Sequence, residues 1–220
     1  MALTLYYHPL ASYCHKVLIA LYENDIAFEA RIVDLGAEKD RTELAALWPF
    51  CKFPVIRDHA RQRNVAESSI IIEYLDQFFP GQHPLIPKGF EEALEVRLWD
   101  RTFDNYVHEP MQDIVLDRIL GTKRDMGSAR ATIQTAYTLI DKQLASSPWA
   151  AGQNFSLADC AAAPALFYAH TLEPFPEPHT HLRAYFEKLM ARPSVQRVLA
   201  EAKPYFPMYP FYSAIPAQFL

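Results

Sequence analysis

The residues with the clearest chemical potential lie between Tyr6 and Val17, where the sequence reads YYHPLASYCHKV. A reactive thiol at the start of a helix that follows a strand usually belongs to a Cys-x-x-Cys pair. In this chain Ala11 takes the place of the first cysteine, and Cys14 is the second. The stretch therefore indicates either a redox site that has lost its nucleophile or a site of another kind.

Cys14 and Ser12 have different interpretations because of their places in the predicted helix. One apolar stripe at i, i+3, i+4 and i+7 comprises Cys14, Val17, Leu18 and Leu21. Burial on such a stripe raises the pKa of a thiol and makes it unreactive, which favours packing over chemistry for Cys14. Ser12 lies at the helix start, where its hydroxyl can either cap free N–H groups or point at a ligand.

Two further stretches carry weaker signals. LWPFCKFPVIRD, residues 47–58, places Pro54 at the first position of a predicted strand, where the missing N–H is tolerated. NVAESSIIIEYLDQFF, residues 64–79, places Glu67 and Ser68 where a strand ends and a helix begins. A helix start with a serine attracts a carboxylate, and an acid beside it could hold an ammonium group. The alternative is helix capping alone.

The elements that must position these residues change in kind along the chain. Short β-prone runs alternate with helical ones at Leu3–Tyr7, Phe28–Val33, Pro54–Arg57 and Asn64–Val65. After the proline-rich loop at 79–89, the periodicity predicts only helices, at Glu91–Leu120, Ser128–Ala145, Leu157–Thr171, His181–Ala191 and Ser194–Ala202. We therefore expect an α/β domain over 1–81, a linker over 82–89 and an all-helical domain over 90–220.

Composition excludes several classes of function. The formal net charge is -5, and no cluster of lysine and arginine is present, which argues against nucleic acid or an anionic membrane as partner. Three scattered cysteines do not form a disulfide framework, and neither a signal peptide nor a spanning helix is predicted. His179 and His181 lack the spacing of a zinc site, so no metal is expected. The chain is predicted to be cytoplasmic.

Together and in this order, the three stretches resemble the N-terminal thioredoxin-like domain of the glutathione transferase superfamily. In that family an activating residue opens the first helix, a cis-proline precedes the third strand, and a Glu-Ser or Asp-Ser pair opens the third helix. A fourth stretch, WAAGQNFSLADCAAAPAL at 149–166, resembles the signature of the family's helical domain. Its Ser156 and Asp159 have the spacing of a capping box. The resemblance extends to about Lys203.

The resemblance implies that glutathione is a cosubstrate and that no metal takes part. The backbone of Phe53, with Pro54 in the cis form after it, would pair with the cysteinyl part of glutathione. Lys52 would lie near the glycyl end. Glu67 and Ser68 would hold the ammonium and carboxylate of the γ-glutamyl part.

The activator departs from the family pattern, because Ala11 stands where related proteins use cysteine or serine. We infer that Ser12 is the nearest hydroxyl able to donate to the glutathione sulfur. Such a bond favours the thiolate and lowers the thiol pKa from about 8.5. Tyr6 or Tyr7 could supply a phenol instead, although alternate strand residues face opposite ways, so at most one points at the site.

The resemblance thus implies a two-domain transferase in which glutathione thiolate attacks a small apolar electrophile bound by the helical domain, in a homodimer. Two alternatives stay open. One is a non-catalytic glutathione-binding regulatory module, as the missing activator at Ala11 suggests, and the other is a glutathione-dependent thiol-disulfide reductase using Cys14. Two further departures are Cys51, where a glycine is often found, and Trp48, where an asparagine is usual.

The C-terminal segment, PYFPMYPFYSAIPAQFL at 204–220, is unusual in composition. It is too apolar to remain in water and contains too many prolines to be helical throughout. We expect it to pack on the helical domain, either as a wall of the acceptor pocket or away from it.

Overall fold

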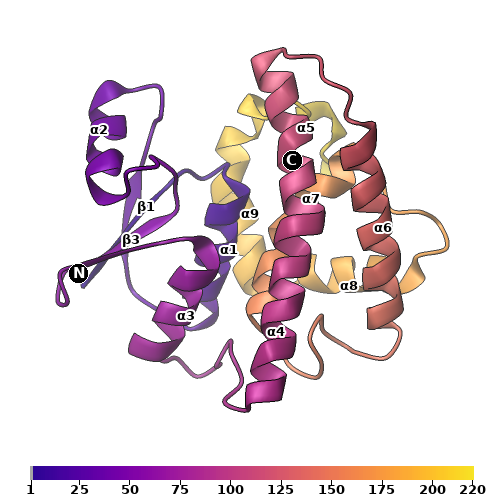
Figure 1. Ribbon diagram of the computed structural model, residues 1–220, viewed down its shortest axis with the longest axis horizontal. Helices are drawn as coiled ribbons and strands as arrows, with labels where there is room; N and C mark the ends of the chain where they lie inside the picture. The colour runs from indigo at the N-terminus through magenta and orange to yellow at the C-terminus, as the bar shows by residue number, and fades with distance from the viewer. Residues whose placement is uncertain (1) are drawn as a thin grey trace. The chain divides into compact units, whose positions relative to one another are not determined.

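The computed structural model describes residues 2–220 and contains two compact units, Met1–Leu85 and Ile86–Leu220 (Figure 1). The division falls within the predicted linker at 82–89. The first unit contains a four-stranded sheet with three helices, and the second is helical. The predicted fold class, α/β followed by all-α, is confirmed.

The sheet of the first unit has the strand order β2-β1-β3-β4. Its strands are β1 (Leu3–Tyr7), β2 (Glu29–Ile32), β3 (Val55–Asp58) and β4 (Arg63–Ala66). β2 is parallel to β1, whereas β1 with β3 and β3 with β4 are antiparallel. The third strand begins at Val55, one residue later than predicted, because Pro54 has no N–H to donate to the ladder.

Helices cover both faces of this sheet (Figure 1). α1 (Ser12–Glu23) and α3 (Ser68–Phe78) pack together on one face, and α2 (Glu38–Leu47) lies on the other. Leu44 is the buried residue of α2, and it packs with Val33 and Val55. The sheet therefore lies between two layers of helices, and the ends of its strands lie along its edges.

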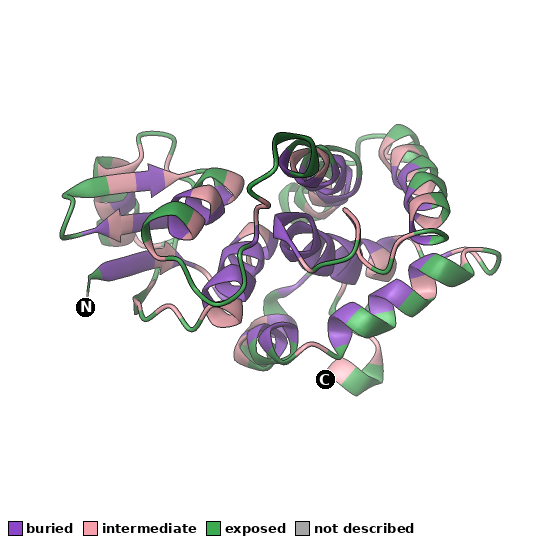
Figure 2. Ribbon diagram, turned by 90° about the horizontal axis from the view of Figure 1, so that it is seen from below, coloured by how far each residue is buried: buried purple, intermediate pink, exposed green. Residues whose placement is uncertain are grey.

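Burial follows the predicted periodicity with two differences. The strand that begins at the N-terminus is buried (Figure 2), and Leu3 and Leu5 are both fully buried. α1 is buried on more than one stripe, since nine of its twelve residues are buried. In α3 the helical period puts Ile70 on the same face as Ile71 and Tyr74, yet Ile70 is 53% exposed and Ile72 is buried instead.

The second unit contains six α-helices and one π-helical turn over residues 86–202. They are α4 (Phe90–Phe103), η1 (Asp104–His108, the π turn), α5 (Glu109–Leu120), α6 (Gly127–Leu144), α7 (Leu157–Leu172), α8 (Thr180–Met190) and α9 (Pro193–Ala202). The single helix predicted over 91–120 is interrupted by η1. Pro110 has no N–H and its ring clashes with the preceding turn, which accounts for the wider turn before it.

No helix among residues 2–220 combines the length and the apolarity that crossing a membrane requires.

The C-terminal segment forms three short 3-10 turns, η2 (Lys203–Met208), η3 (Tyr212–Ala214) and η4 (Ala217–Phe219). The rings of Phe206 and Phe219 lie 5.9 and 5.3 Å from the ring of Phe167 in α7. The hydroxyl of Tyr209 is 2.9 Å from that of Thr171. The expectation that this segment packs on the helical part of the chain is confirmed.

Candidate functional site

Strand pairing brings the predicted site residues to one edge of the sheet. Tyr6 pairs with Val55, and Val55 pairs with Ala66. The connections after β1, before β3 and after β4 therefore meet at the same edge, because these neighbouring strands are antiparallel. These three connections, with the first turns of the helices that follow, contain all six predicted residues: Ser12, Lys52, Phe53, Pro54, Glu67 and Ser68.

The connection before β3 presents an open backbone. The peptide bond between Phe53 and Pro54 is cis, as the resemblance implied. Among residues 2–220 no hydrogen bond uses the backbone N–H or carbonyl of Phe53. Lys52 is exposed beside it. An extended ligand with its own N–H and carbonyl groups can pair with such a segment in the manner of an added strand.

The backbone conformation at Cys51 accounts for the glycine that is often found at this position in the family. The φ of Cys51 is +51°, in the left-handed region that glycine adopts without steric cost. The side chain packs, together with Trp48, against the cluster formed by Leu44 and Val55. Its thiol donates to the carbonyl of Arg41 at 3.5 Å. These contacts hold the cysteine in a conformation that few other residue types adopt.

The start of α3 is uncapped. Glu67 is the N-cap residue, with φ 66° and ψ 117°, and no side chain caps the helix. Ser68 is the first helical residue and is 8% exposed. The interpretation of this pair as helix capping alone is therefore wrong. A non-glycine residue held at positive φ is typical of functional sites, and an uncapped helix start presents N–H groups and a positive dipole end to an anion.

The start of α1 differs from the capping prediction in the same way. Ala11, not Ser12, is the N-cap residue, and alanine has no acceptor to cap with. Ser12 is the first helical residue and is 7% exposed. The Nε2 atom of His15 donates to the carbonyl of Pro9 at 2.6 Å, which ties the preceding loop to the helix. Burial lowers the pKa of His15 to about 4, so this histidine is neutral near pH 7.

Cys14 packs in the core, as predicted. It is fully buried, and burial raises the pKa of its thiol to about 12. A thiol with this pKa carries almost no thiolate at neutral pH and is not a nucleophile. The reductase alternative based on Cys14 therefore loses its reactive group.

The two strand tyrosines face opposite sides of the sheet. Tyr6 packs on the side of α2, where burial in the first place and then the negative charge of Glu43 raise the pKa of its hydroxyl. Tyr7 is 7% exposed on the opposite side. Tyr6 is thereby excluded as the residue that activates a thiol at the edge.

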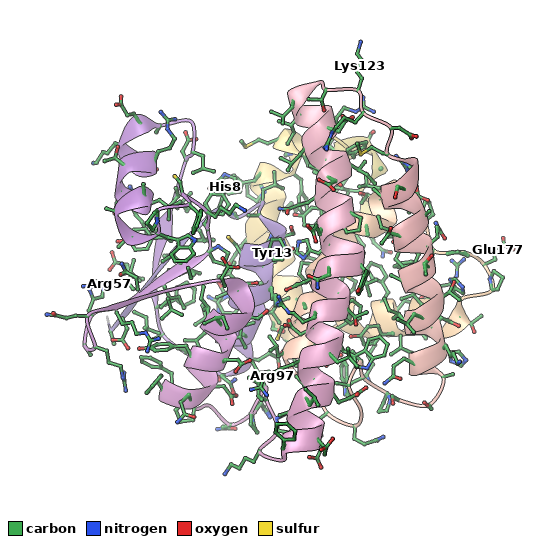
Figure 3. The ribbon with its side chains drawn as sticks, viewed as in Figure 1. His8, Tyr13, Arg57, Arg97, Lys123 and Glu177 are labelled. Carbon is green, nitrogen blue, oxygen red and sulfur yellow. The ribbon has the colours of Figure 1, made fainter. Side chains whose placement is uncertain are left out.

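His8 is a site residue that the sequence analysis did not single out. Its Nδ1 atom accepts the N–H of Leu10 at 3.2 Å. Its ring stacks on that of Phe53, with centroids 6.2 Å apart and an interplanar angle of 22°. Figure 3 labels His8 just before α1 and Tyr13 in its first turn. The sequence signal for this role is a polar side chain in the connection from a strand to a helix, where it can accept the backbone N–H two residues further along.

Over residues 2–220, no group of three or more histidine, cysteine and acidic side chains is placed to hold a metal ion.

The capping box predicted in the second unit is present at the start of α7. Ser156 is the N-cap, and the carboxylate of Asp159 accepts its backbone N–H at 2.9 Å. The same carboxylate accepts the N–H of Ala150 at 3.0 Å and the hydroxyl of Tyr185 at 2.6 Å. All four residues are buried, so the box joins α7 to α8 within the second unit.

Comparison with known proteins agrees with both halves of this description. Residues 5–83 match the family model "Glutathione S-transferase, N-terminal domain", and residues 113–193 match "Glutathione S-transferase, C-terminal domain". Glutathione S-transferase F10 of Arabidopsis thaliana is 28% identical over 215 residues, 91% of this chain and 98% of that protein. A stringent starvation protein A homolog of Haemophilus influenzae is 28% identical over 204 residues, 92% of each chain.

Solved structures share the fold. Glutathione transferase F7 of Populus trichocarpa has a TM-score of 0.80 at 23% identity, covering 91% of this chain and 99% of its own. A glutathione S-transferase of Methylobacillus flagellatus with glutathione bound has a TM-score of 0.77 at 22% identity, covering 89% and 98%. With two family models that together span most of the sequence, the chain belongs to the glutathione transferase superfamily.

Proposed function

We propose that the protein is a glutathione transferase that conjugates glutathione thiolate to a small apolar electrophile in the cytoplasm. The observation that carries this proposal is the open backbone of Phe53 at the same sheet edge as the uncapped start of α3. A peptide with an extended backbone and a free α-amino acid end is complementary to that pair of features. Glutathione has both, and a glutathione-bound relative shares the fold.

Each part of glutathione has a proposed partner. The cysteinyl N–H and carbonyl pair with the backbone of Phe53, next to Pro54. The γ-glutamyl carboxylate accepts hydrogen bonds from Ser68 and the first N–H groups of α3, and Glu67 pairs with the ammonium. The exposed Lys52 lies in the same connection as Phe53 and attracts the glycyl carboxylate.

The proposed chemical step needs little beyond thiolate stabilisation. Ser12 donates a hydrogen bond to the sulfur, which lowers the pKa of the glutathione thiol. The thiol proton passes to solvent. The thiolate then attacks the electrophilic carbon. A C–S bond forms, and the leaving group departs with the bonding electron pair. The proposal involves no metal.

The test combines binding, conjugation and a titration. Calorimetry measures glutathione affinity, and a chloronitroaromatic substrate reports conjugation through its absorbance change. Ser12→Ala is expected to leave affinity nearly unchanged and to cut the bound thiolate population about ten- to a hundredfold at neutral pH, the effect of one charge-assisted hydrogen bond. Ultraviolet titration of bound glutathione checks this. An unchanged thiol pKa in Ser12→Ala would remove Ser12 from the mechanism.

A second candidate function is a glutathione-binding module without catalysis. Two observations favour it: Ala11 stands at the usual activator position, and stringent starvation protein A homologs are among the relatives. In that case glutathione binds, but neither the chloronitroaromatic nor a glutathione mixed disulfide reacts faster than in buffer. Turnover of the mixed disulfide alone would instead point to reductase chemistry.

We also propose a homodimer formed through α4. Phe90, Leu94 and Leu98 are four residues apart on one line of this helix and are 73%, 50% and 56% exposed. A monomer rarely leaves such a row in water. Light scattering should show a dimer that Leu94→Glu with Leu98→Glu converts to a monomer, whereas the exposed Glu91→Gln does not. A wild-type monomer at all concentrations would contradict this.

A further inference from the structure

We propose that His8 is a positioning residue, which holds the loop that carries Ser12 at a fixed distance from the backbone of Phe53. The inference rests on the proposed function of the edge site and assigns a role to a side chain outside its set of ligand contacts. Its basis is that His8 contacts both loops at once.

The first contact closes the loop between β1 and α1. The ring Nδ1 of His8 accepts the N–H of Leu10 at 3.2 Å, and the carbonyl of His8 accepts the N–H of Ala11 at 3.0 Å. From the helix side, His15 holds the carbonyl of Pro9. The backbone that leads to Ser12 is therefore held from both ends.

The second contact reaches the other loop. The ring of His8 stacks on Phe53 at a centroid distance of 6.2 Å, within the range of favourable aromatic pairs. Phe53 supplies the backbone to which the cysteinyl part of glutathione is proposed to bind. The stack thus links the segment that fixes the sulfur to the segment that fixes the hydroxyl.

The loop bond requires the neutral form of His8, because a protonated Nδ1 cannot accept. Burial lowers the pKa of His8, while Asp34 acts in the opposite direction. The neighbouring His15, with a pKa of about 4, and Cys14, with a thiol pKa of about 12, are both uncharged near pH 7. The charge near His8 that opposes the neutral form is therefore that of Asp34.

The consequence concerns kcat more than affinity. Removing His8 lets the hydroxyl of Ser12 move relative to the sulfur, which weakens the bond to the thiolate and raises the thiol pKa. The γ-glutamyl contacts at Glu67 and Ser68 lie at the start of α3 and are unaffected. A merely structural role would lower affinity and stability together instead.

Three variants separate the two contacts of His8. His8→Asn keeps an acceptor two residues before Leu10 and loses the ring, whereas His8→Phe keeps the ring and loses the acceptor. His8→Ala loses both. Ultraviolet titration of bound glutathione should show about a fivefold loss of thiolate in His8→Ala, as expected for one neutral hydrogen bond, and smaller losses in the other two. The exposed His83→Ala is the control and should match wild type.

A double-mutant cycle tests whether His8 acts through Ser12. In the Ser12→Ala background, His8→Ala should cause no further rise in the thiol pKa. Independent, additive effects of the two substitutions would overturn the proposal. A thiol pKa in His8→Ala equal to that of wild type would also overturn it. The proposal would fail as well if His8→Ala raised the thiol pKa while Ser12→Ala alone left it unchanged.

Failure of the proposed function gives a different result. If wild type binds glutathione but forms no conjugate, transferase activity is wrong and the titration still decides the role of His8. If glutathione does not bind, amide hydrogen exchange of Leu10 in the ligand-free protein decides it. Exchange should be faster in His8→Ala and His8→Phe than in His8→Asn, and equal rates in all three would overturn the proposal. Should His8→Ala unfold, the Asn and Phe variants carry the comparison.

Discussion

Helices α7 and α3 both begin beside a serine and an acidic residue, but they use the pair in opposite ways. At α7, Ser156 and Asp159 form a closed capping box whose hydrogen bonds are buried. At α3, Glu67 and Ser68 leave the helix uncapped, and the backbone of Glu67 is held at positive φ. A closed helix start stabilises its unit, whereas an open one keeps N–H groups and a dipole end for a ligand.

α1 lies between these two cases. On its buried side Cys14 packs in the core and His15 holds the loop carbonyl of Pro9. At its first turn the N-cap is Ala11, whose side chain makes no capping hydrogen bond. Substitutions at the three helix starts should therefore divide into effects on stability and effects on ligand binding.

The largest expected effect is at the closed start. Asp159→Ala removes the acceptor for Ala150, Ser156 and Tyr185, all buried, and each orphaned donor costs about 1–3 kcal/mol. We expect a loss of about 4 kcal/mol in the free energy of unfolding, measured by urea denaturation. The exposed Asp113→Ala should change stability by less than about 0.5 kcal/mol. An Asp159→Ala variant as stable as wild type would show that the box is dispensable.

The next effect is on the pH dependence of stability. His15 has a folded pKa of about 4, below its ordinary 6.5, so between these values the unfolded chain binds more protons. Stability should therefore fall as pH drops from 6.5 to 4, by about 3 kcal/mol from this residue. His15→Gln keeps a donor for Pro9 without titrating, so its urea midpoint should fall less over that range. Parallel pH profiles of the two proteins would exclude this linkage.

At the open start the effect should be on binding. Ser68→Ala is expected to weaken glutathione affinity about tenfold or more, through a lost hydrogen bond to a carboxylate, with stability nearly unchanged. Ser156→Ala is the matched variant at the closed start, and it should cost about 1 kcal/mol of stability with affinity unchanged. Calorimetry and urea denaturation of both variants test the contrast. If both substitutions changed affinity and stability in the same way, the contrast between the two helix starts would be contradicted.

The smallest effect should come from the buried side of α1. Cys14→Ala removes one buried sulfur and should cost about 1 kcal/mol of stability through the small cavity left behind. Conjugation by the folded variant should equal that of wild type. Loss of activity in a fully folded Cys14→Ala protein would return this cysteine to the list of candidate nucleophiles.

Local patterns in the sequence predicted the elements well and their detailed roles less well. The four strands, the helical second half and the capping box of Ser156 and Asp159 all follow from spacing between near neighbours. The π turn before Pro110 was missed, although a proline inside a predicted helix is the signal for it. The exposure of Ile70 and the burial of Ile72 do not follow from the periodicity of α3, which does not distinguish its buried face from the adjacent one.

The sequence by itself determined the order and type of elements and the packing of Cys14, because periodicity is a local property, and its motifs supplied the candidate residues of the site through their resemblance to the glutathione transferase family. Only the tertiary structure decided that Tyr6 faces α2, that Ala11 and Glu67 take the N-cap positions, and that His8 reaches Phe53. These facts depend on strand register and on pairing between residues distant in the chain. Register sets which strand ends meet and which face each side chain occupies, and it becomes fixed only when strands that are distant in the chain pair with one another.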